Sequence, residues 1–286
     1  YIDYPAYAKR IDPNPRAEGF VTDENKDQYP ELGNNRVGVS MQYVGREPRF
    51  YASVAYNGST WYLLNEPNDA NKDKQIFYYR GGGNGYTNTM FWLRTGIGVM
   101  KFVHPDDTNR DEKEEYIRKK AEPAIRYAEI LLIYAEALNE LTGNYNIASW
   151  DEETQYTIQR NIDEMKKGIQ PIRIRAGIPD YTRSEYEDQD LFREKLKRER
   201  QIELMGEGHR YYDIRRWKDA EVEESLPIYG CNTLMTEKWR DVFHVPVAIP
   251  SLPTNFSRKM YFWPISHSEL KRNKMLTQNP GWTYND

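Results

Sequence analysis

A run of aromatic side chains beside short polar ones is the feature of this sequence best suited to binding chemistry. Twelve of the fifty residues from Tyr43 to Trp92 are aromatic, against 14% of the whole chain. A sugar presents an apolar C–H face and a rim of hydroxyl groups, and flat rings beside amide and charged groups match both. We therefore expect this stretch to bind a ligand with such a surface.

Only some of these rings are expected to reach a ligand. Strand alternation buries about half of such a set, so Phe50, Tyr51 and Tyr56 are expected in a core. Rings next to turns, Gly or Asn are better placed for exposure, because loops carry a large share of binding residues. The predicted ligand-binding residues are Trp61, Tyr78, Tyr79, Tyr86 and Trp92, together with Arg80 and Asn84.

Residue patterns for catalysis are scarce. The sequence holds no Gly-x-Ser-x-Gly, no His-Glu-x-x-His, no phosphate loop ending in Gly-Lys-Ser/Thr and no EF-hand loop. Carboxylate pairs such as Asp106-Asp107 and Glu152-Glu153 could serve glycoside hydrolysis, but 44 acidic residues make such pairs common by chance. The four histidines share no metal-ligand spacing, and the single cysteine excludes a cysteine-rich metal site. We expect no catalytic residue, no metal and no cofactor.

The stretch from Glu199 to Trp217 carries interleaved bases and acids. A phosphate-binding surface would carry the bases alone, so nucleic acid is not an expected partner. The pattern fits a solvated, salt-bridged helix pair, and Arg beside Glu near Gly and Trp also fits a buried Arg–carboxylate cluster. Structural roles are predicted for Glu199, Glu203, Arg210, Asp213, Arg216 and Trp217. Of these, Glu203, Arg210, Arg216 and Trp217 are predicted to be largely buried and bonded to one another.

This stretch, ERQIELMGEGHRYYDIRRW, resembles the hallmark of the SusD-like (RagB/SusD) family in its C-terminal half. Three further stretches agree in the family's order: RYAEILLIYAEALNE at 126–140, IRIRAGIP at 172–179, and YFWPISHSEL followed by LTQNPGW at 261–282. Together these motifs are specific, whereas one alone would not be.

The resemblance implies a non-catalytic nutrient-binding lipoprotein on the extracellular face of an outer membrane. Such a protein binds a glycan and delivers it to a SusC-like TonB-dependent transporter, over which it closes as a lid. Its membrane attachment is through a lipid anchor that this sequence lacks, so we expect a C-terminal fragment or processed part that ends at a natural C-terminus. A peptide-binding member of the family, a glycoside hydrolase and a structural lid without a ligand are the alternatives.

The apolar pattern predicts a mainly α fold with irregular loops and short strands. Helices are expected from Glu122-Pro123 to Leu141, where small Ala positions let another helix approach closely, and from Asp151 to Lys167, with a kink or break at Pro171 and a stop at Gly177 and Pro179. A further helix is expected from Thr182 or Ser184 to Met205, with Leu191, Ile202 and Met205 on one face and Phe192 and Leu196 beside them, and another through Tyr211, Ile214 and Trp217. Gly206 and Gly208 provide the corner between the last two. These helix pairs resemble the tetratricopeptide-like pairs of the family.

Residues 1–121 are expected to form a loop-rich, partly β, aromatic-rich subdomain that binds the ligand, and residues 122–286 a helical region with a loop insertion at 222–257. Within the first, residues 1–35 are expected to be irregular. A hairpin of residues 49–56 and 61–64 is predicted around Asn57-Gly58, followed by strands at 75–80 and 97–103. The run Gly81–Gly85 lacks the lysine and the helix of a phosphate loop, so a mobile turn is expected.

Length and composition set the outer limits. A chain of 286 residues, 38% of them hydrophobic, can bury a sizeable core in one large or two small domains. The net charge of −4 gives no general attraction to polyanions. The mean hydropathy of −0.90 and the absence of an apolar run of about twenty residues argue against a membrane-spanning helix.

Overall fold

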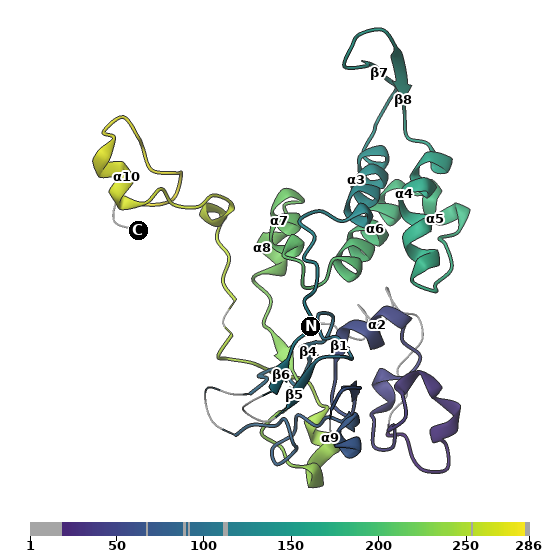
Figure 1. The fold of residues 1–286 in the computed structure, drawn as a ribbon. Coiled ribbons are helices and arrows are strands. Elements are labelled where there is room, and N and C mark those ends of the chain that lie inside the picture. Colours follow the sequence, from purple (N-terminus) through teal and green to yellow (C-terminus); the bar gives the residue numbers. More distant parts are fainter. Residues whose placement is uncertain are drawn as a thin grey trace.

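The computed structural model describes residues 19–66, 68–87, 90, 92–110, 114–252 and 254–283. The fold is mainly helical with a few short strands, as the sequence predicts (Figure 1). Helices α3 to α6 gather in one part, short strands and loops lie in another, and the segment that leads to α10 (His267–Arg272) extends to one side. Of the residues predicted to be irregular, 1–18 lie outside the described residues, and 19–35 form loops with two short 3₁₀ turns.

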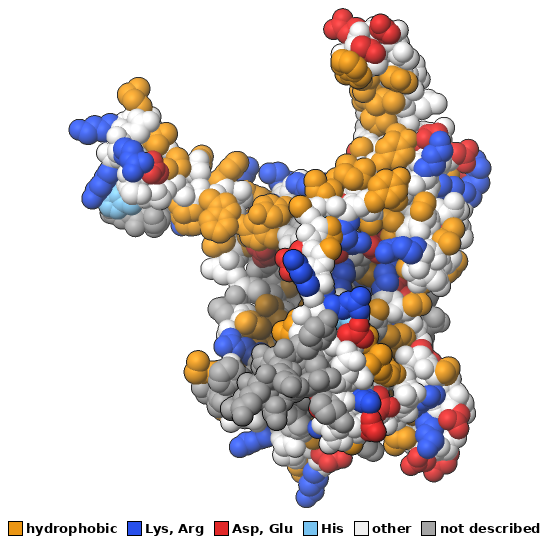
Figure 2. Space-filling model, viewed as in Figure 1, with side chains coloured by type: hydrophobic (Ala, Val, Ile, Leu, Met, Phe, Trp, Pro, Cys, Tyr) orange, Lys and Arg blue, Asp and Glu red, His pale blue; other side chains and the backbone are white. Residues whose placement is uncertain are grey.

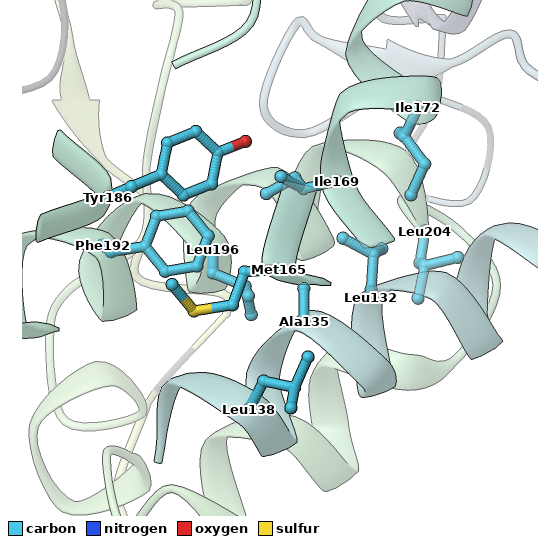
Figure 3. Close-up of a cluster of buried hydrophobic side chains, with 10 residues drawn as sticks. All are labelled: Leu132, Ala135, Leu138, Met165, Ile169, Ile172, Tyr186, Phe192, Leu196 and Leu204. Carbon is cyan, nitrogen blue, oxygen red and sulfur yellow. The ribbon is translucent and has the colours of Figure 1, made fainter. Parts of the chain in front are cut away.

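The helical part is built on one apolar core. Its helices are α3 (Tyr127–Asn139), α4 (Ile162–Arg175), α5 (Arg183–Glu187), α6 (Gln189–Glu203) and α7 (His209–Arg216). The core side chains, drawn in Figure 3, are Leu132, Ala135, Leu138, Met165, Ile169, Ile172, Tyr186, Phe192, Leu196 and Leu204. They come from α3, α4, α5 and α6 and from the residue after α6, so burial of this cluster holds these helices together.

Helices α3 and α4 approach closely because one of the facing residues is a glycine. An ideal β-carbon on Gly168 would lie 2.5 Å from the carbonyl oxygen of Leu131 and 2.8 Å from Cβ of Ala135. No larger residue fits at this position without a backbone shift. The expectation that small residues of the first helix allow close packing is confirmed at Ala135.

The start of α3 differs from the prediction. The helix begins at Tyr127 and not at Glu122-Pro123, because Arg126 is extended, with φ −104° and ψ 147°. The guanidinium of Arg126 bonds to Glu203 and Glu207, which holds this residue outside the helix.

The predicted helix from Asp151 to Lys167 is wrong in its first half. Residues Tyr145–Ala148 (β7) and Gln155–Ile158 (β8) form an antiparallel hairpin instead. Their apolar residues recur at every second position, which favours strands, and this alternation was not recognised. Helix α4 begins after Asn161, whose side chain accepts a hydrogen bond from the backbone of Glu164 at 3.1 Å.

The predicted break at Pro171 does not occur, since α4 continues to Arg175. Proline removes one hydrogen bond from a helix interior. Ile169 and Ile172 on either side of it are buried in the core, and their packing offsets that loss. The predicted stop at Gly177 is confirmed, with φ +73° and an amide bonded to the carbonyl of Ile174.

The predicted helix from Thr182 to Met205 is divided in two. Thr182 and Glu185 form a capping box at the start of α5, and the side chain of Asp188 caps α6. The buried face of α6 carries Phe192 and Leu196, whereas Leu191 of the predicted apolar face is exposed. The corner after α6 is confirmed, because Gly206 and Gly208 both adopt positive φ.

Charged residues on the buried face of α6 explain that error. Glu199, Arg200 and Glu203 are all buried on this helix. An apolar-periodicity argument does not count charged residues as interior, so it finds Phe192 and Leu196 but not the charged part of the buried face. The separate prediction that Glu203 is buried is confirmed.

The predicted hairpin around Asn57-Gly58 is wrong, although the turn itself is present. Residues Pro48–Ser53 form helix α2, with Pro48 at its first position. The strands before and after the turn belong to different sheets: β1 (Val54–Ala55) pairs with β4 (Gly98–Val99), and β2 (Thr60–Tyr62) pairs with β3 (Asp73–Gln75). Of the predicted strand at 75–80 only Gln75, the last residue of β3, is in a strand, and of the one at 97–103 only the two residues of β4 are.

The predicted loop insertion contains only short elements. They are β9 (Tyr229–Gly230) paired with β10 (Val247–Ala248), helix α9 (Arg240–Phe243) and one 3₁₀ turn, preceded by α8 (Ala220–Glu223). The insertion packs back on the strand-bearing part through Cys231 and Phe243, which share a core cluster with Ala55, Tyr78 and Tyr79. None of the helices that the structure describes has the length and apolar character of a membrane span.

Candidate functional site

The Gly81–Gly85 run is a compact turn closed by backbone hydrogen bonds. The amide of Gly82 bonds to the carbonyl of Tyr79 at 2.9 Å, and that of Asn84 to the carbonyl of Phe77 at 3.1 Å. An ideal β-carbon on Gly85 would lie 1.9 Å from the carbonyl oxygen of Tyr79. Here glycine allows one backbone segment to lie directly on another. The turn can therefore hold the side chains beside it in fixed positions.

Two of the predicted ligand-binding rings, Tyr78 and Tyr79, are buried. Tyr79 contacts Phe77 with ring centroids 5.2 Å apart and Phe243 at 6.3 Å. Burial raises the pKa of Tyr78, while a contact from Trp61 lowers it by a smaller amount. Their exposure was inferred from the nearby glycines, but the distant segment around Phe243 covers both rings. We correct the assignment of Tyr78 and Tyr79 from ligand contact to core.

Trp61 is half-buried and packs against the same cluster. It lies on β2 opposite Lys74, and its indole nitrogen is buried. One side of this ring therefore supports the core and does not face solvent.

Tyr86 and Trp92 lie at the surface of this part and contact each other. Their ring centroids are 5.4 Å apart at an interplanar angle of 85°, and both side chains are half-buried. Edge-to-face contact fixes the orientation of each ring. Arg80 and Asn84, at the two ends of the same turn, are exposed. The structure thus brings four of the seven predicted residues to one surface.

A further exposed ring, Trp239, was not predicted and follows a segment that pairs with Arg80. The amide of Arg80 bonds to the carbonyl of Met235 at 2.8 Å, and Arg80 forms a parallel bridge with Thr236. Thr236 leads into the 3₁₀ turn Glu237–Trp239, where the Trp239 side chain is 55% exposed. No local pattern links residues so far apart in the chain. We name Arg80, Asn84, Tyr86, Trp92 and Trp239 the loop surface.

The charged stretch predicted to be structural forms a buried ion-pair cluster on α6. Glu199 accepts from Arg49 at 2.6 Å and from Arg173 at 2.7 Å. Glu203 accepts from Arg49 at 3.1 Å and lies 2.6 Å from Arg175. Two carboxylates thus share the guanidinium of Arg49, which belongs to α2 in the strand-bearing part.

Arg126 extends this cluster beyond the corner. It bonds to Glu203 at 3.0 Å and to Glu207 at 2.6 Å. Burial raises the pKa of the Glu203 carboxyl. The charge of Arg175 and hydrogen bonds from Arg126 and Arg49 together lower it by more, so the net pKa is depressed. A buried carboxylate that keeps its charge in this way needs all of these partners.

A second branch of the cluster joins α6 and α7 to α3. Arg200 donates to Asp213 at 2.7 Å, and Asp213 also accepts from Arg216 at 2.9 Å. Arg216 in turn bonds to Glu136, which also accepts from the indole nitrogen of Trp217 at 2.7 Å. Three of the predicted structural residues, Asp213, Arg216 and Trp217, take part in this branch.

Three details of that prediction are corrected. Arg210 lies outside the cluster and pairs at 3.0 Å with Glu223 on the surface. The Arg216 side chain is 42% exposed and Trp217 is half-buried, so neither is largely buried. Helix α7 is short. Only its Asp213 and Ile214 side chains are buried, and its other side chains are at least partly exposed. Glu136 and Arg49, which hold the ends of the cluster, were not predicted because they lie far away in the chain.

A cavity of about 320 Å³ lies between α3, the middle of α6 and the end of α7. Its lining residues are Glu136, Asn139, Glu140, Arg193, Leu196, Lys197, Arg216 and Trp217. The charged groups are already paired, for example Arg193 with Glu140 at 2.7 Å and Lys197 with Asp219 at 2.7 Å. Among the described residues, no group of three or more His, Cys, Asp or Glu side chains could hold a metal ion.

Comparison with known proteins supports the resemblance noted from the motifs. The model of the SusD family matches residues 12–282. The SusD-like protein P2 of Formosa agariphila is 31% identical over 162 residues, which are 55% of this chain and 25% of that protein.

Two solved structures share the fold. A selenomethionine form of BT4246 superposes with a TM-score of 0.71 at 23% identity, over 92% of this chain and 42% of that one. A SusD-like protein of Bacteroides fragilis NCTC 9343, BF3747, has a TM-score of 0.63 at 27% identity, over 84% of this chain and 40% of that one. The chain thus spans between a quarter and two fifths of these relatives. It belongs to the SusD family.

Proposed function

We propose that this chain forms part of a cell-surface glycan-binding protein that holds its ligand without cleaving it, and that the loop surface contacts the glycan. The observation that carries this proposal is the surface itself. It comprises the half-buried rings of Tyr86 and Trp92, which contact each other, the exposed side chains of Arg80 and Asn84, and the exposed ring of Trp239, which follows the segment that pairs with Arg80.

The chemistry of such a surface suits a sugar chain. Aromatic faces pack on the C–H face of a pyranose, and amide and guanidinium groups donate to its hydroxyl and ring oxygens. The edge-to-face contact of Tyr86 with Trp92 and the compact Gly81–Gly85 turn position these groups before the ligand arrives. Positioning of this kind reduces the entropic cost of binding.

The carboxylate pairs that could serve hydrolysis are occupied or isolated. Asp107 bonds to Lys120, which together with the backbone amides of His104 and Arg118 lowers its pKa to about 2. A general acid needs a raised pKa instead. Glu152 and Glu153 are exposed in the loop between β7 and β8. These observations support binding without catalysis.

Family membership supports a location and a partner. We propose that the protein lies on the extracellular face of the outer membrane, attached by a lipid anchor. There it would pass its glycan to a SusC-like TonB-dependent transporter.

An affinity-gel screen of the full-length protein against neutral polysaccharides, acidic polysaccharides and peptides tests the proposal. Retardation by a polysaccharide, with no new reducing ends after prolonged incubation, is the expected result. Retardation by peptides alone would identify a peptide-binding member of the family. Release of reducing ends that one carboxylate substitution abolishes would identify a hydrolase.

A further inference from the structure

The backbone that follows Trp92 lies directly on the loop insertion. The amide of Cys231 bonds to the carbonyl of Thr95 at 2.8 Å. An ideal β-carbon on Gly230 would lie 2.6 Å from Cα of Thr95 and 2.7 Å from its carbonyl oxygen. Glycine at position 230 therefore allows the two backbones to touch, a short way along the chain from the Trp92 ring.

A glycine on the Trp92 side makes a second close contact with the insertion. Gly96 has φ +66°, and its amide bonds to the carbonyl of Leu93 at 3.1 Å. An ideal β-carbon on Gly96 would lie 2.9 Å from Cβ of Cys231 and 3.1 Å from Cγ2 of Thr233. Both of these side chains are buried. One glycine on each segment thus lets the two segments pack at backbone distance.

The same part of the insertion also holds the backbone of Arg80. The amide of Arg80 bonds to the carbonyl of Met235 at 2.8 Å, and Arg80 pairs with Thr236. Between this contact and the previous one, the amide of Met235 bonds to the carbonyl of Asn232 at 3.0 Å. We name residues 230–236 the bridging segment, because it joins two of the backbones that carry the loop surface.

The bridging segment is anchored in the core of the strand-bearing part. Cys231 belongs to the buried cluster that contains Tyr78, Tyr79 and Phe243. The amide of Asn232 bonds to the carbonyl of Phe243 at 2.8 Å. Close-packed interiors transmit a displacement and do not absorb it. A change at one end of the segment is therefore expected to move the backbone at the other end.

We infer that Gly230 is a positioning residue for the glycan, because through the bridging segment it sets where Trp92 and Arg80 stand relative to each other. This role rests on the proposed function, in which the loop surface is the glycan site. The contact groups of a binding site must be held to within about 0.5 Å. Figure 2 shows basic and acidic side chains interspersed over the part that carries the short strands. Because both signs of charge are mixed there, affinity depends on the placement of individual groups.

Gly230→Ala in the full-length protein tests this role, with Gly168→Ala as the matched control. A β-carbon at position 168 meets backbone just as closely, 2.5 Å from the carbonyl oxygen of Leu131. It lies between α3 and α4, away from the short strands (Figure 1). Both changes should lower the melting temperature, because each adds a methyl group where backbone already stands. Only Gly230→Ala should weaken binding.

The binding probe is whichever of amylopectin, galactomannan, xylan and pectin retards the unaltered full-length protein most in an affinity gel. We expect Gly230→Ala to raise Kd about tenfold, the size of a partly lost aromatic contact, and Gly168→Ala to change it less than about twofold. In a Trp92→Ala background, Gly230→Ala should raise Kd by about threefold or less, because the ring that it displaces is gone. A further tenfold rise there would mean that the two positions act independently, which would overturn the positioning role.

Failure of this role is distinguishable from failure of the proposed function. Weaker binding by Trp92→Ala with an unchanged Kd in Gly230→Ala would overturn the positioning role alone. An unchanged Kd in Trp92→Ala would overturn the proposed function and the positioning role with it. Should Gly230→Ala not fold, Thr233→Ala replaces it, since that change removes a buried methyl group facing Gly96 and adds no overlap.

Hydrogen exchange followed by mass spectrometry tests the linkage without a ligand. The amide of Arg80, bonded to the carbonyl of Met235, should exchange about tenfold faster in Gly230→Ala, because the far end of the bridging segment opens more often. Gly168→Ala should leave this exchange rate as it is in the unaltered protein. Equal exchange at Arg80 in all three proteins would overturn the inference.

Discussion

The guanidinium of Arg49 lies 2.6 Å from one carboxylate oxygen of Glu199, across 150 residues of sequence. Arg49 stands on α2 among the loops and short strands, whereas Glu199 stands on α6 in the helical part. Only 2% of the Glu199 side chain is exposed. This pair therefore attaches the two parts of the molecule to each other through a buried charge.

Arg49→Ala is expected to lower the free energy of unfolding by about 3 kcal/mol, because it leaves buried carboxylates short of a partner. Arg173 and Arg175 remain beside Glu199 and Glu203, which keeps the cost at the lower end of the range. Urea unfolding measures the change. Arg183→Ala, which breaks the exposed pair with Glu187, is the control and should cost less than about 1 kcal/mol. Equal effects of the two substitutions would contradict a buried role for Arg49.

Acid should weaken the protein through Glu185 of the capping box. Burial raises the pKa of this carboxyl, but hydrogen bonds from Lys195 and Thr182 lower it by more. The net pKa falls from the ordinary 4.5 to about 2. A depressed pKa means that the unfolded chain binds the proton first, so the stabilisation is complete above pH 4.5 and is lost as the pH falls toward 2. Glu185→Gln should flatten the decline of unfolding free energy across this window.

Glu187→Gln, a change on the same helix at an exposed side chain, is the control for that titration. Its decline with pH should match that of the unaltered protein. If the unfolding free energy declined with the same slope in both variants, Glu185 would not contribute to the loss of stability in acid.

The sequence predicts helices well where apolar spacing is regular, and poorly where charges are buried. Apolar spacing finds α3 but places its start too early, and Gly177 marks the end of α4 as predicted. The burial of Glu203 was predicted, but its partners were not, because Arg49, Arg126 and Arg175 come from distant segments. A single sequence does not show which distant arginine meets which glutamate, and local propensity carries no such information.

The ligand surface illustrates the same limit. Tyr86 and Tyr79 both lie near the Gly81–Gly85 turn, and both were predicted to reach a ligand. Tertiary packing separates them, because the cluster that includes Phe243 buries Tyr79 and leaves Tyr86 partly open. Trp239 was missed for a related reason, since its segment is brought to the turn by the pairing of Thr236 with Arg80.

Gly85→Ala should destabilise the protein by about 1–3 kcal/mol, because the new methyl group would overlap the carbonyl oxygen of Tyr79. Gly83→Ala in the same turn is the matched control. Nothing lies within 4 Å of a β-carbon at Gly83, so its effect should stay within about 0.5 kcal/mol. Thermal unfolding of the two variants provides the comparison. Similar melting temperatures would show that the turn yields to the added group.

Trp61→Ala should act on stability and not directly on the ligand. Half of this side chain packs against the cluster that contains Tyr78 and Phe243, so truncation leaves a cavity there. We expect a loss of about 2–3 kcal/mol in unfolding free energy, below the range for a fully buried tryptophan. Weaker glycan binding with an unchanged denaturation midpoint would instead return Trp61 to the ligand site.

Trp239→Ala and Trp92→Ala should each weaken glycan binding by about 1–3 kcal/mol, the size expected when an aromatic contact at the centre of a binding surface is removed. Calorimetry on folded variants measures this loss. Trp150→Ala is the control, since that ring is 96% exposed on the hairpin, away from the loop surface, and its removal should leave affinity unchanged. Affinity should also vary little with salt, because stacking and neutral hydrogen bonds are not screened as ion pairs are. Unchanged affinity in both loop-surface variants would show that the glycan does not bind at this surface. A steep salt dependence would point to a charged ligand held by Arg80.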